Sequence, residues 1–101
     1  MWIELDPGKG DEGLALREPD DFKGFAVRAT APTVADDLRA LGRPADDEHV
    51  YVDPAVLLRL AGERAEDPAW LESLAGMTAF AAEHGWVDEA GFIRAHVEPR
   101  G

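Results

Sequence analysis

Short runs in which hydrophobic and polar residues alternate predict five β-strands. They cover residues 2–5, 14–17, 22–29, 49–52 and 93–98. The alternation is most regular in the last run, where the apolar side chains are separated by Arg94, His96 and Glu98. Successive side chains of a strand point to opposite faces of its sheet. We therefore expect Arg94, His96 and Glu98 to share the face that points away from the core.

Apolar residues with helical spacing predict a first helix in the middle of the chain. Val34, Leu38 and Leu41 recur at intervals of four and three residues, which places them on one face of a helix. Thr33 precedes them, and its hydroxyl oxygen can accept a hydrogen bond from the first turn, so we expect it to be the N-cap. Gly42 follows and is expected to end the helix.

Two Asp-Pro pairs predict where two further helices begin. Asp53 and Asp67 are good N-cap residues, and each is followed by a proline, whose missing N–H is not needed at the first helical position. We expect helices over residues 54–64 and 69–84, and we expect Gly85 to end the second of them.

The two helices differ in the amount of apolar surface that they carry. Helix 54–64 has a narrow core face with Leu58 on the opposite side, so Leu58 is expected to be exposed. In helix 69–84 the apolar residues cover about half of the circumference, which predicts the central helix of the domain. Trp86 follows at the start of a turn, and an exposed tryptophan commonly anchors an interface. Leu58 and Trp86 are therefore the candidate interface residues.

Together these elements predict one α+β domain over residues 1–101, in which a small, mainly antiparallel sheet packs on three helices. From His49 onward the order is strand, helix, helix and a hairpin over residues 86–93. In element order this C-terminal half resembles the winged helix, an architecture best known for reading DNA. The resemblance implies DNA contacts by helix 69–84, but that helix has no Lys or Arg and carries Glu72 and Glu83.

Charge changes the partners that we expect. The chain of 101 residues has 21 Asp and Glu against 10 Lys and Arg, which gives a formal charge of −11. Such a chain repels phosphate backbones and anionic membrane surfaces. We therefore expect another protein with a basic surface as the partner, and neither nucleic acid nor membrane. The oligomeric state stays open.

Composition adds an expectation about location. The chain is 46% hydrophobic, which is enough to support a core, and it has no cysteine, so disulfides and thiolate chemistry are not expected. No apolar run approaches the roughly 20 residues of a membrane-spanning helix. The first residues also lack the pattern of a signal peptide. We expect a cytoplasmic location.

The candidate polar site consists of Arg94, His96, Glu98 and His84. Same-face neighbours on a strand lie about 6.5–7 Å apart, so the row formed by Arg94, His96 and Glu98 is able to bind an anion or move a proton. His84 is expected at the C-terminal end of a helix, where the helix dipole favours a cationic imidazole. The only serine is Ser73, and no metal-binding spacing occurs, so we expect neither a metal nor a cofactor.

Three functions fit these features. The favoured one is a non-catalytic accessory or protein-interaction module with an acidic surface. The alternatives are a small-molecule-binding domain or small enzyme with a pocket between sheet and helices, and a winged-helix-like regulator that acts through protein contacts. Enzymatic activity stays open, and the lack of a nucleophile or metal motif favours a non-catalytic role.

Overall fold

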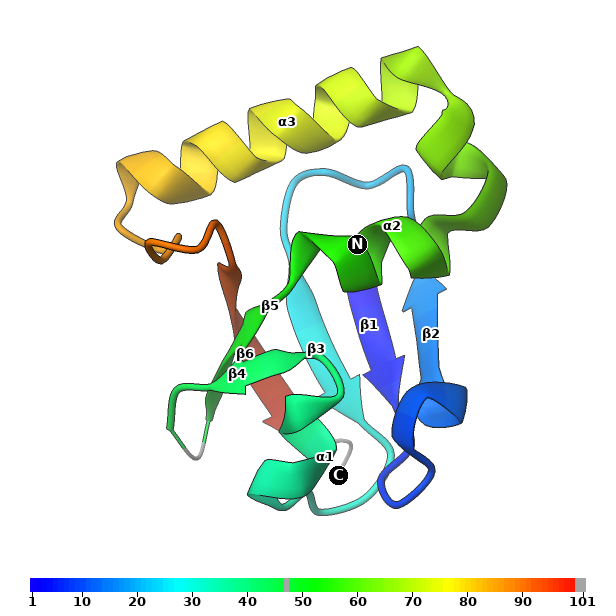
Figure 1. The fold of residues 1–101 in the computed structure, drawn as a ribbon, viewed down its shortest axis with the longest axis vertical. Coiled ribbons are helices and arrows are strands. Elements are labelled where there is room, and N and C mark those ends of the chain that lie inside the picture. Colours follow the sequence, from blue (N-terminus) through cyan, green and yellow to red (C-terminus); the bar gives the residue numbers. More distant parts are fainter. Residues whose placement is uncertain (47, 100–101) are drawn as a thin grey trace.

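The structure, a computed structural model, describes residues 1–46 and 48–99 of the chain. Its strands form a six-stranded sheet in the order β2-β1-β3-β6-β5-β4 (Figure 1). The strands are β1 (Trp2–Leu5), β2 (Leu14–Arg17), β3 (Ala26–Ala29), β4 (Gly42–Pro44), β5 (His49–Val52) and β6 (Ile93–Pro99). The helices are α1 (Ala35–Arg39), α2 (Pro54–Ala61) and α3 (Pro68–Glu83), together with the short 3₁₀ helices η1 (Gly10–Gly13) and η2 (Gly62–Glu66).

The sheet is mixed. β1 pairs antiparallel with β2, and β5 pairs antiparallel with both β4 and β6, whereas β3 runs parallel to its neighbours β1 and β6. The α+β class that the sequence predicts is confirmed. The expected antiparallel character holds for the two flanks of the sheet, while its centre is parallel.

One face of the sheet carries the core. Ile3, Val27 and Val52 come from three different strands, and each is fully buried at 0% exposure. They belong to one hydrophobic cluster with Leu57 of α2, which lies in front of the sheet in Figure 1. The apolar side chains of β6 are buried on this face too, as their alternation predicts.

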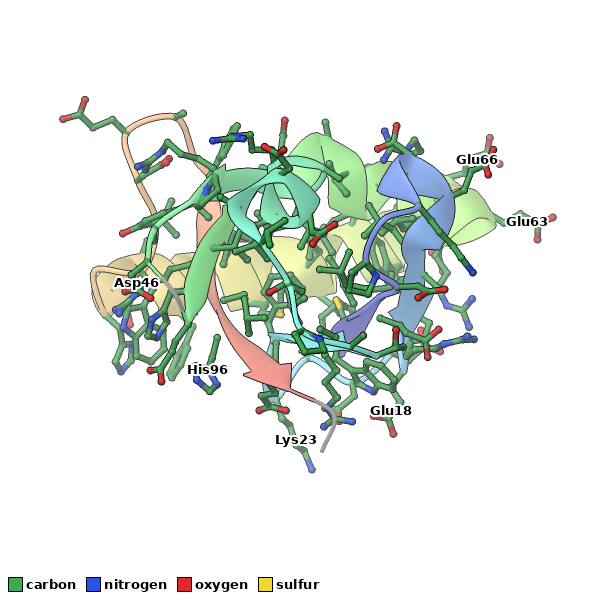
Figure 2. All side chains as sticks on the ribbon, turned by 90° about the horizontal axis from the view of Figure 1, so that it is seen from below. Glu18, Lys23, Asp46, Glu63, Glu66 and His96 are labelled. Atoms are coloured by element: carbon green, nitrogen blue, oxygen red, sulfur yellow. The ribbon has the colours of Figure 1, made fainter. Side chains whose placement is uncertain are left out.

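The opposite face of the sheet, called here the open face, is accessible to solvent. The side chains that β1, β3, β5 and β6 direct to it are half-buried or exposed wherever the structure describes their burial. Figure 2 shows His96, Lys23 and Glu18 on this side, away from α2. Cationic and aromatic groups meet on it, since the guanidinium of Arg28 lies 4.6 Å from the ring centre of Trp2.

The last helix, α3, is not the central helix that its sequence predicts. It crosses one end of the sheet instead of lying over the middle (Figure 1). Trp70 and Leu74 are buried, but Leu71 and Phe80 of its wide apolar arc are 37% and 56% exposed. A wide arc shows that much of a helix is able to be buried, and it does not show that the rest of the chain covers it.

The N-cap of the first helix is not Thr33. α1 begins at Ala35, and Val34 is the N-cap. The carboxylate of Asp37 accepts a hydrogen bond from the Val34 N–H at 2.9 Å. The N–H of Asp37 in turn donates to the Val34 carbonyl oxygen at 3.0 Å. The capping interaction therefore comes from an acid inside the first turn, and a threonine hydroxyl is not needed.

Gly42 does not end a helix. It begins β4, a strand that is absent from the five that the sequence predicts. A Cβ at Gly42 would overlap the carbonyl oxygen of Tyr51 on the neighbouring strand β5. The glycine is therefore required by the close approach of two backbones.

The other helix ends follow their local sequence more closely. The carboxylate of Asp53 accepts a hydrogen bond from the Ala55 N–H at 2.9 Å, and that of Asp67 accepts one from the Ala69 N–H at 3.0 Å. Helix α2 is shorter than expected, because Gly62 (φ 60°) follows Ala61 and the chain continues as η2.

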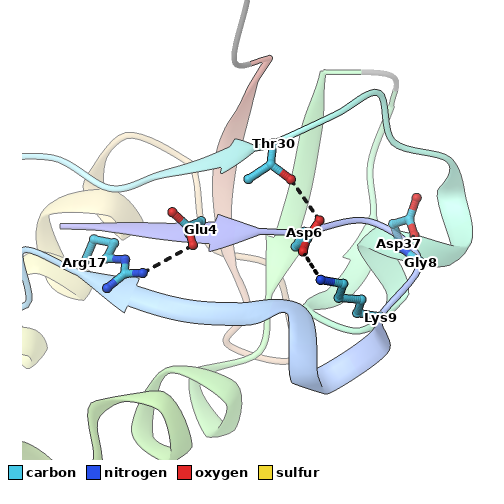
Figure 3. Close-up of polar contacts among 7 residues, drawn as sticks. All are labelled: Glu4, Asp6, Gly8, Lys9, Arg17, Thr30 and Asp37. Atoms are coloured by element: carbon cyan, nitrogen blue, oxygen red, sulfur yellow. Dashed lines mark hydrogen bonds and ion pairs between the residues drawn. The ribbon is translucent and has the colours of Figure 1, made fainter.

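A polar cluster around Asp6 fixes the loop that follows β1 (Figure 3). The carboxylate of Asp6 accepts a hydrogen bond from the Thr30 hydroxyl at 3.0 Å and pairs with Lys9 Nζ at 2.6 Å. These two contacts, led by that with Lys9, lower the pKa of the Asp6 carboxyl. The Gly8 N–H donates to Asp37 at 2.9 Å, which ties the same loop to α1.

Candidate functional site

Two adjoining cavities lie where the open face of the sheet meets the end of α3. Phe25, Trp86 and Arg94 line both of them. The first cavity has a volume of about 290 Å³ and is completed by His49 and His96. The second has a volume of about 100 Å³ and extends under α3. We call the two cavities together the Arg94 groove.

The end of α3 positions Trp86 in this groove. Gly85 adopts a left-handed conformation (φ 76°), and its N–H donates to the Ala82 carbonyl oxygen at 3.0 Å. The Trp86 N–H donates to the Ala81 carbonyl oxygen at 2.9 Å. This pair of hydrogen bonds is a Schellman motif, in which the residue after the glycine folds back onto the last turn of the helix. The Gly85 helix stop therefore also places the tryptophan.

The aromatic groups at this helix end contact one another. The His84 ring stacks on Trp86 with ring centres 4.6 Å apart, and Phe80 lies 4.4 Å from His84. Trp86 is 40% exposed, so this aromatic cluster borders solvent.

The start of β6 places Arg94 beside Trp86. The Arg94 N–H donates to the Trp86 carbonyl oxygen at 2.7 Å. The loop between the two residues is fixed by Asp88, whose carboxylate accepts hydrogen bonds from the N–H groups of Ala90 and Phe92, both at 2.9 Å. Arg43 donates to the same carboxylate at 2.7 Å and is the main cause of its lowered pKa.

The pairing of the cations distinguishes this groove from the rest of the surface. Seven lysines and arginines form ion pairs, namely Lys9–Asp6, Arg17–Glu4, Arg28–Glu98, Arg39–Asp36, Arg43–Asp88, Arg59–Asp11 and Arg64–Asp20. Lys23 and Arg94 have no carboxylate within ion-pair distance among residues 1–46 and 48–99. Both line the smaller cavity of the groove.

These two cations, Lys23 and Arg94, differ in how far they are buried. Arg94 is half-buried, and within the described part of the chain its guanidinium has no hydrogen-bond partner. Lys23 is exposed, and its side chain points outward from the rim (Figure 2). Arg94 is therefore the group that a bound anion would contact, and Lys23 adds positive charge nearby.

Histidines line the opposite end of the groove. β5 and β6 pair in a register that places His49 opposite His96, with ring centres 5.3 Å apart. His49 Nδ1 lies 3.0 Å from the carboxylate of Asp46. The pKa of Asp46 is lowered, first by the Glu48 N–H and then by His49. Sequence reasoning missed His49, because only the pairing of distant strands brings it to His96.

The predicted site residues are divided between two places. Arg94, His96 and Trp86 line the groove, and His84 stacks behind Trp86. Glu98 does not join them, because its carboxylate pairs with Arg28 at 3.2 Å. Leu58 is 37% exposed on α2 and lines neither cavity, and Gly85, Asp53 and Asp67 act at helix ends. Phe25, which borders both cavities, is a further residue that the sequence does not single out.

The described residues form neither a metal site nor a membrane-spanning helix, and no similar protein is found. Across residues 1–46 and 48–99, no three His, Cys, Asp or Glu side chains are grouped so that they could hold a metal ion. No helix in the same part of the chain has the length and apolarity needed to cross a membrane. Comparisons with protein-family models, with curated proteins and with solved structures find no match.

The chemistry of the groove follows from its lining. Phe25 and Trp86 offer aromatic surface, and Arg94 in the same lining offers N–H donors in a planar fork that matches a carboxylate. His96 and His49 add hydrogen-bonding groups at the far end. The arrangement suits a ligand that combines an anionic group with an apolar one.

Proposed function

We propose that this chain is a non-catalytic protein-binding module, and that it holds its partner through the Arg94 groove. The bound segment presents a carboxylate to Arg94 and an apolar side chain to Phe25 and Trp86. The observation that carries the proposal is that Arg94 is half-buried and that its guanidinium lacks a described partner, in a chain of formal charge −11. Where carboxylates outnumber cations, an arginine in a cavity without a described carboxylate partner is suited to bind an external anion.

The openness of the groove favours a protein over a small molecule. Small-ligand sites usually enclose most of their ligand. Here Trp86 is 40% exposed, Phe80 beside it is 56% exposed, and His96 is exposed as well. Such a surface covers one side of a peptide segment. Tryptophan and arginine are also the residues that most often dominate binding energy at protein interfaces.

The acidic remainder of the surface adds a condition on the partner. Outside the groove, carboxylates dominate the chain, so a partner that is basic around its bound carboxylate gains favourable charge contacts. The partner surface is then basic, as the net charge of this chain predicts, and it carries one carboxylate that contacts Arg94.

A second candidate uses α3. The order β5, α2 and α3 is that of the winged-helix-like alternative, but residues 86–93 pair only through the isolated bridge Val87–Ile93 and form no hairpin of two strands. Leu71 and Phe80 are exposed along α3. In that case α3 would contact another protein, because it contains no Lys or Arg with which to contact DNA phosphates.

Peptide display tests the proposal directly. Short random peptides are selected against the purified protein, and the enriched sequences are synthesised for affinity measurement. We expect enrichment of peptides that combine a carboxylate with an apolar residue. The substitution Arg94→Gln is expected to weaken their binding by about tenfold or more, because a charge-assisted hydrogen bond is lost.

The matched control is Arg59→Gln, which makes the same change at an exposed arginine that lines neither cavity and should leave affinity unchanged. Circular dichroism establishes that both variants fold. A selection without enriched sequences, or peptides that bind the Arg94→Gln protein as tightly as the parent, would contradict the proposal.

A further inference from the structure

The smaller cavity of the groove combines an apolar interior with a charged rim. Its interior is formed by Phe22, Met77, Ala81 and Ile93, of which Ala81 and Ile93 are buried. Its volume of about 100 Å³ is that of roughly three water molecules or one aliphatic side chain. Arg94 lines the same cavity. An occupant that fills this interior and also contacts Arg94 therefore carries an apolar side chain and an anionic group close together.

An internal acidic residue meets this requirement poorly. In an extended peptide, neighbouring side chains point to opposite faces, so an acid and the apolar residue beside it do not enter one cavity together. Residues two positions apart share a face, but they are separated by about 6.5–7 Å. A C-terminal residue carries its carboxylate and its side chain on the same Cα. It is the one position in a protein at which the two groups are joined this closely.

We infer that the Arg94 groove binds the C-terminus of a partner protein, with an aliphatic last side chain in the smaller cavity and the terminal carboxylate on Arg94. The inference rests on the proposed protein-binding function and specifies its ligand. The preceding residues of the partner pass Phe25 and Trp86 and lie along the larger cavity beside His96. The guanidinium N–H groups, which have no acceptor among the described residues, match the two oxygens of the carboxylate.

The experiment compares two display libraries of the same random peptides. In one library the peptides end in a free carboxylate, and in the other a fixed Gly-Ser tail follows them. We expect enrichment in the first library alone, with Val, Leu, Ile or Met in the last position. The best peptide is then synthesised as a free acid and as an amide. The amide should bind at least about tenfold more weakly to the parent protein.

Arg94→Gln provides the structural control, because the inference places the carboxylate on this side chain. In that variant the acid and the amide should bind with similar affinity, whereas Arg59→Gln, outside the groove, should preserve the difference. This readout compares two ligands on one protein, so a general loss of stability does not imitate it.

The outcomes separate the inference from the function on which it rests. If acid and amide bind the parent equally while Arg94→Gln weakens both, the groove binds internal segments and the C-terminal inference is wrong. If neither library is enriched, the protein-binding function itself fails. If N-acetyl-leucine binds as tightly as the selected peptide, the groove is a small-carboxylate site, and the partner protein is excluded.

Discussion

At the scale of single residues, Arg94 stands out because its charge has no compensation from the described chain. Elsewhere the protein pairs its arginines well: Arg64, for example, donates two hydrogen bonds to Asp20, both at 3.2 Å. Arg94 is half-buried and has lost part of its hydration without gaining such a partner. A bound carboxylate would supply that partner, so the folded protein is already arranged to favour an anion there.

Asp6 illustrates the opposite case, in which a carboxylate is satisfied within the chain. Lys9 and Thr30 bind it and lower its pKa in the folded protein. A carboxyl whose pKa is lower in the folded state stabilises the fold above its unfolded pKa, and the contribution is lost as the pH falls through the folded value. We expect Asp6→Asn to lower the urea midpoint of unfolding at about pH 7, and we expect this deficit to shrink towards about pH 3.

The control for Asp6 is Glu63→Gln. Glu63 is exposed in η2 and forms no ion pair with any described residue. Its neutralisation should leave the urea midpoint nearly unchanged at both pH values. A deficit of Asp6→Asn that stays the same at low pH would show that the ionised carboxylate is not what stabilises the loop after β1.

At the scale of secondary-structure elements, replacing a glycine with alanine is expected to change stability in opposite directions at two positions. Gly42 lies where β4 approaches β5 so closely that a Cβ would overlap the Tyr51 carbonyl oxygen. Gly76 lies in the middle of α3, and a Cβ there would meet nothing within 4 Å. We expect Gly42→Ala to reduce the free energy of unfolding by about 1–3 kcal/mol. We expect Gly76→Ala to raise it by about 0.8–1 kcal/mol, because alanine favours helix.

Urea unfolding of the two variants beside the parent protein measures both changes. The pair is informative because the substitution is identical and its surroundings differ. A stable Gly42→Ala protein would mean that β4 does not pair with β5 as described. A destabilised Gly76→Ala protein would mean that this side of α3 is covered, for instance by a second copy of the chain.

Sequence patterns predicted the elements whose signals are local. β1, β2 and β5 have the predicted bounds, and the inward alternation of β6 is observed. β4 could not be predicted, because three residues that include a glycine and a proline carry no strand signal. The position of α3 was missed for another reason. Periodicity identifies an apolar arc, and only the full packing decides how much of it is covered.

The groove was predictable in part for the same reason. The row of Arg94 and His96 follows from alternation within one strand, and the position of Trp86 follows from the glycine that ends α3. Phe25 and His49 come from distant parts of the chain, and strand order brings them to the same cavity. The absence of a described partner for Arg94 also became visible only when the side chains of residues 1–46 and 48–99 had been placed.

At the scale of the whole molecule, an anionic ligand meets two opposed fields. The formal charge of −11 repels it at long range, over a molecule that measures 35 × 28 × 23 Å. Within the groove, Arg94 and Lys23 attract it at short range. Net charge therefore opposes the approach of the ligand, while the local site determines what is held.

Measuring the association rate at different ionic strengths separates the contributions of these two electrostatic fields. Raising the ionic strength from about 0.01 M to about 0.15 M shortens the Debye length from roughly 30 Å to roughly 8 Å. The longer distance spans most of the molecule, and the shorter one covers little more than the groove. A selected free-acid peptide without other charges should therefore associate severalfold faster at the higher salt in stopped-flow measurements. Its amide should associate at a rate that salt does not change. An association rate for the acid that falls with salt would show instead that long-range attraction governs the encounter.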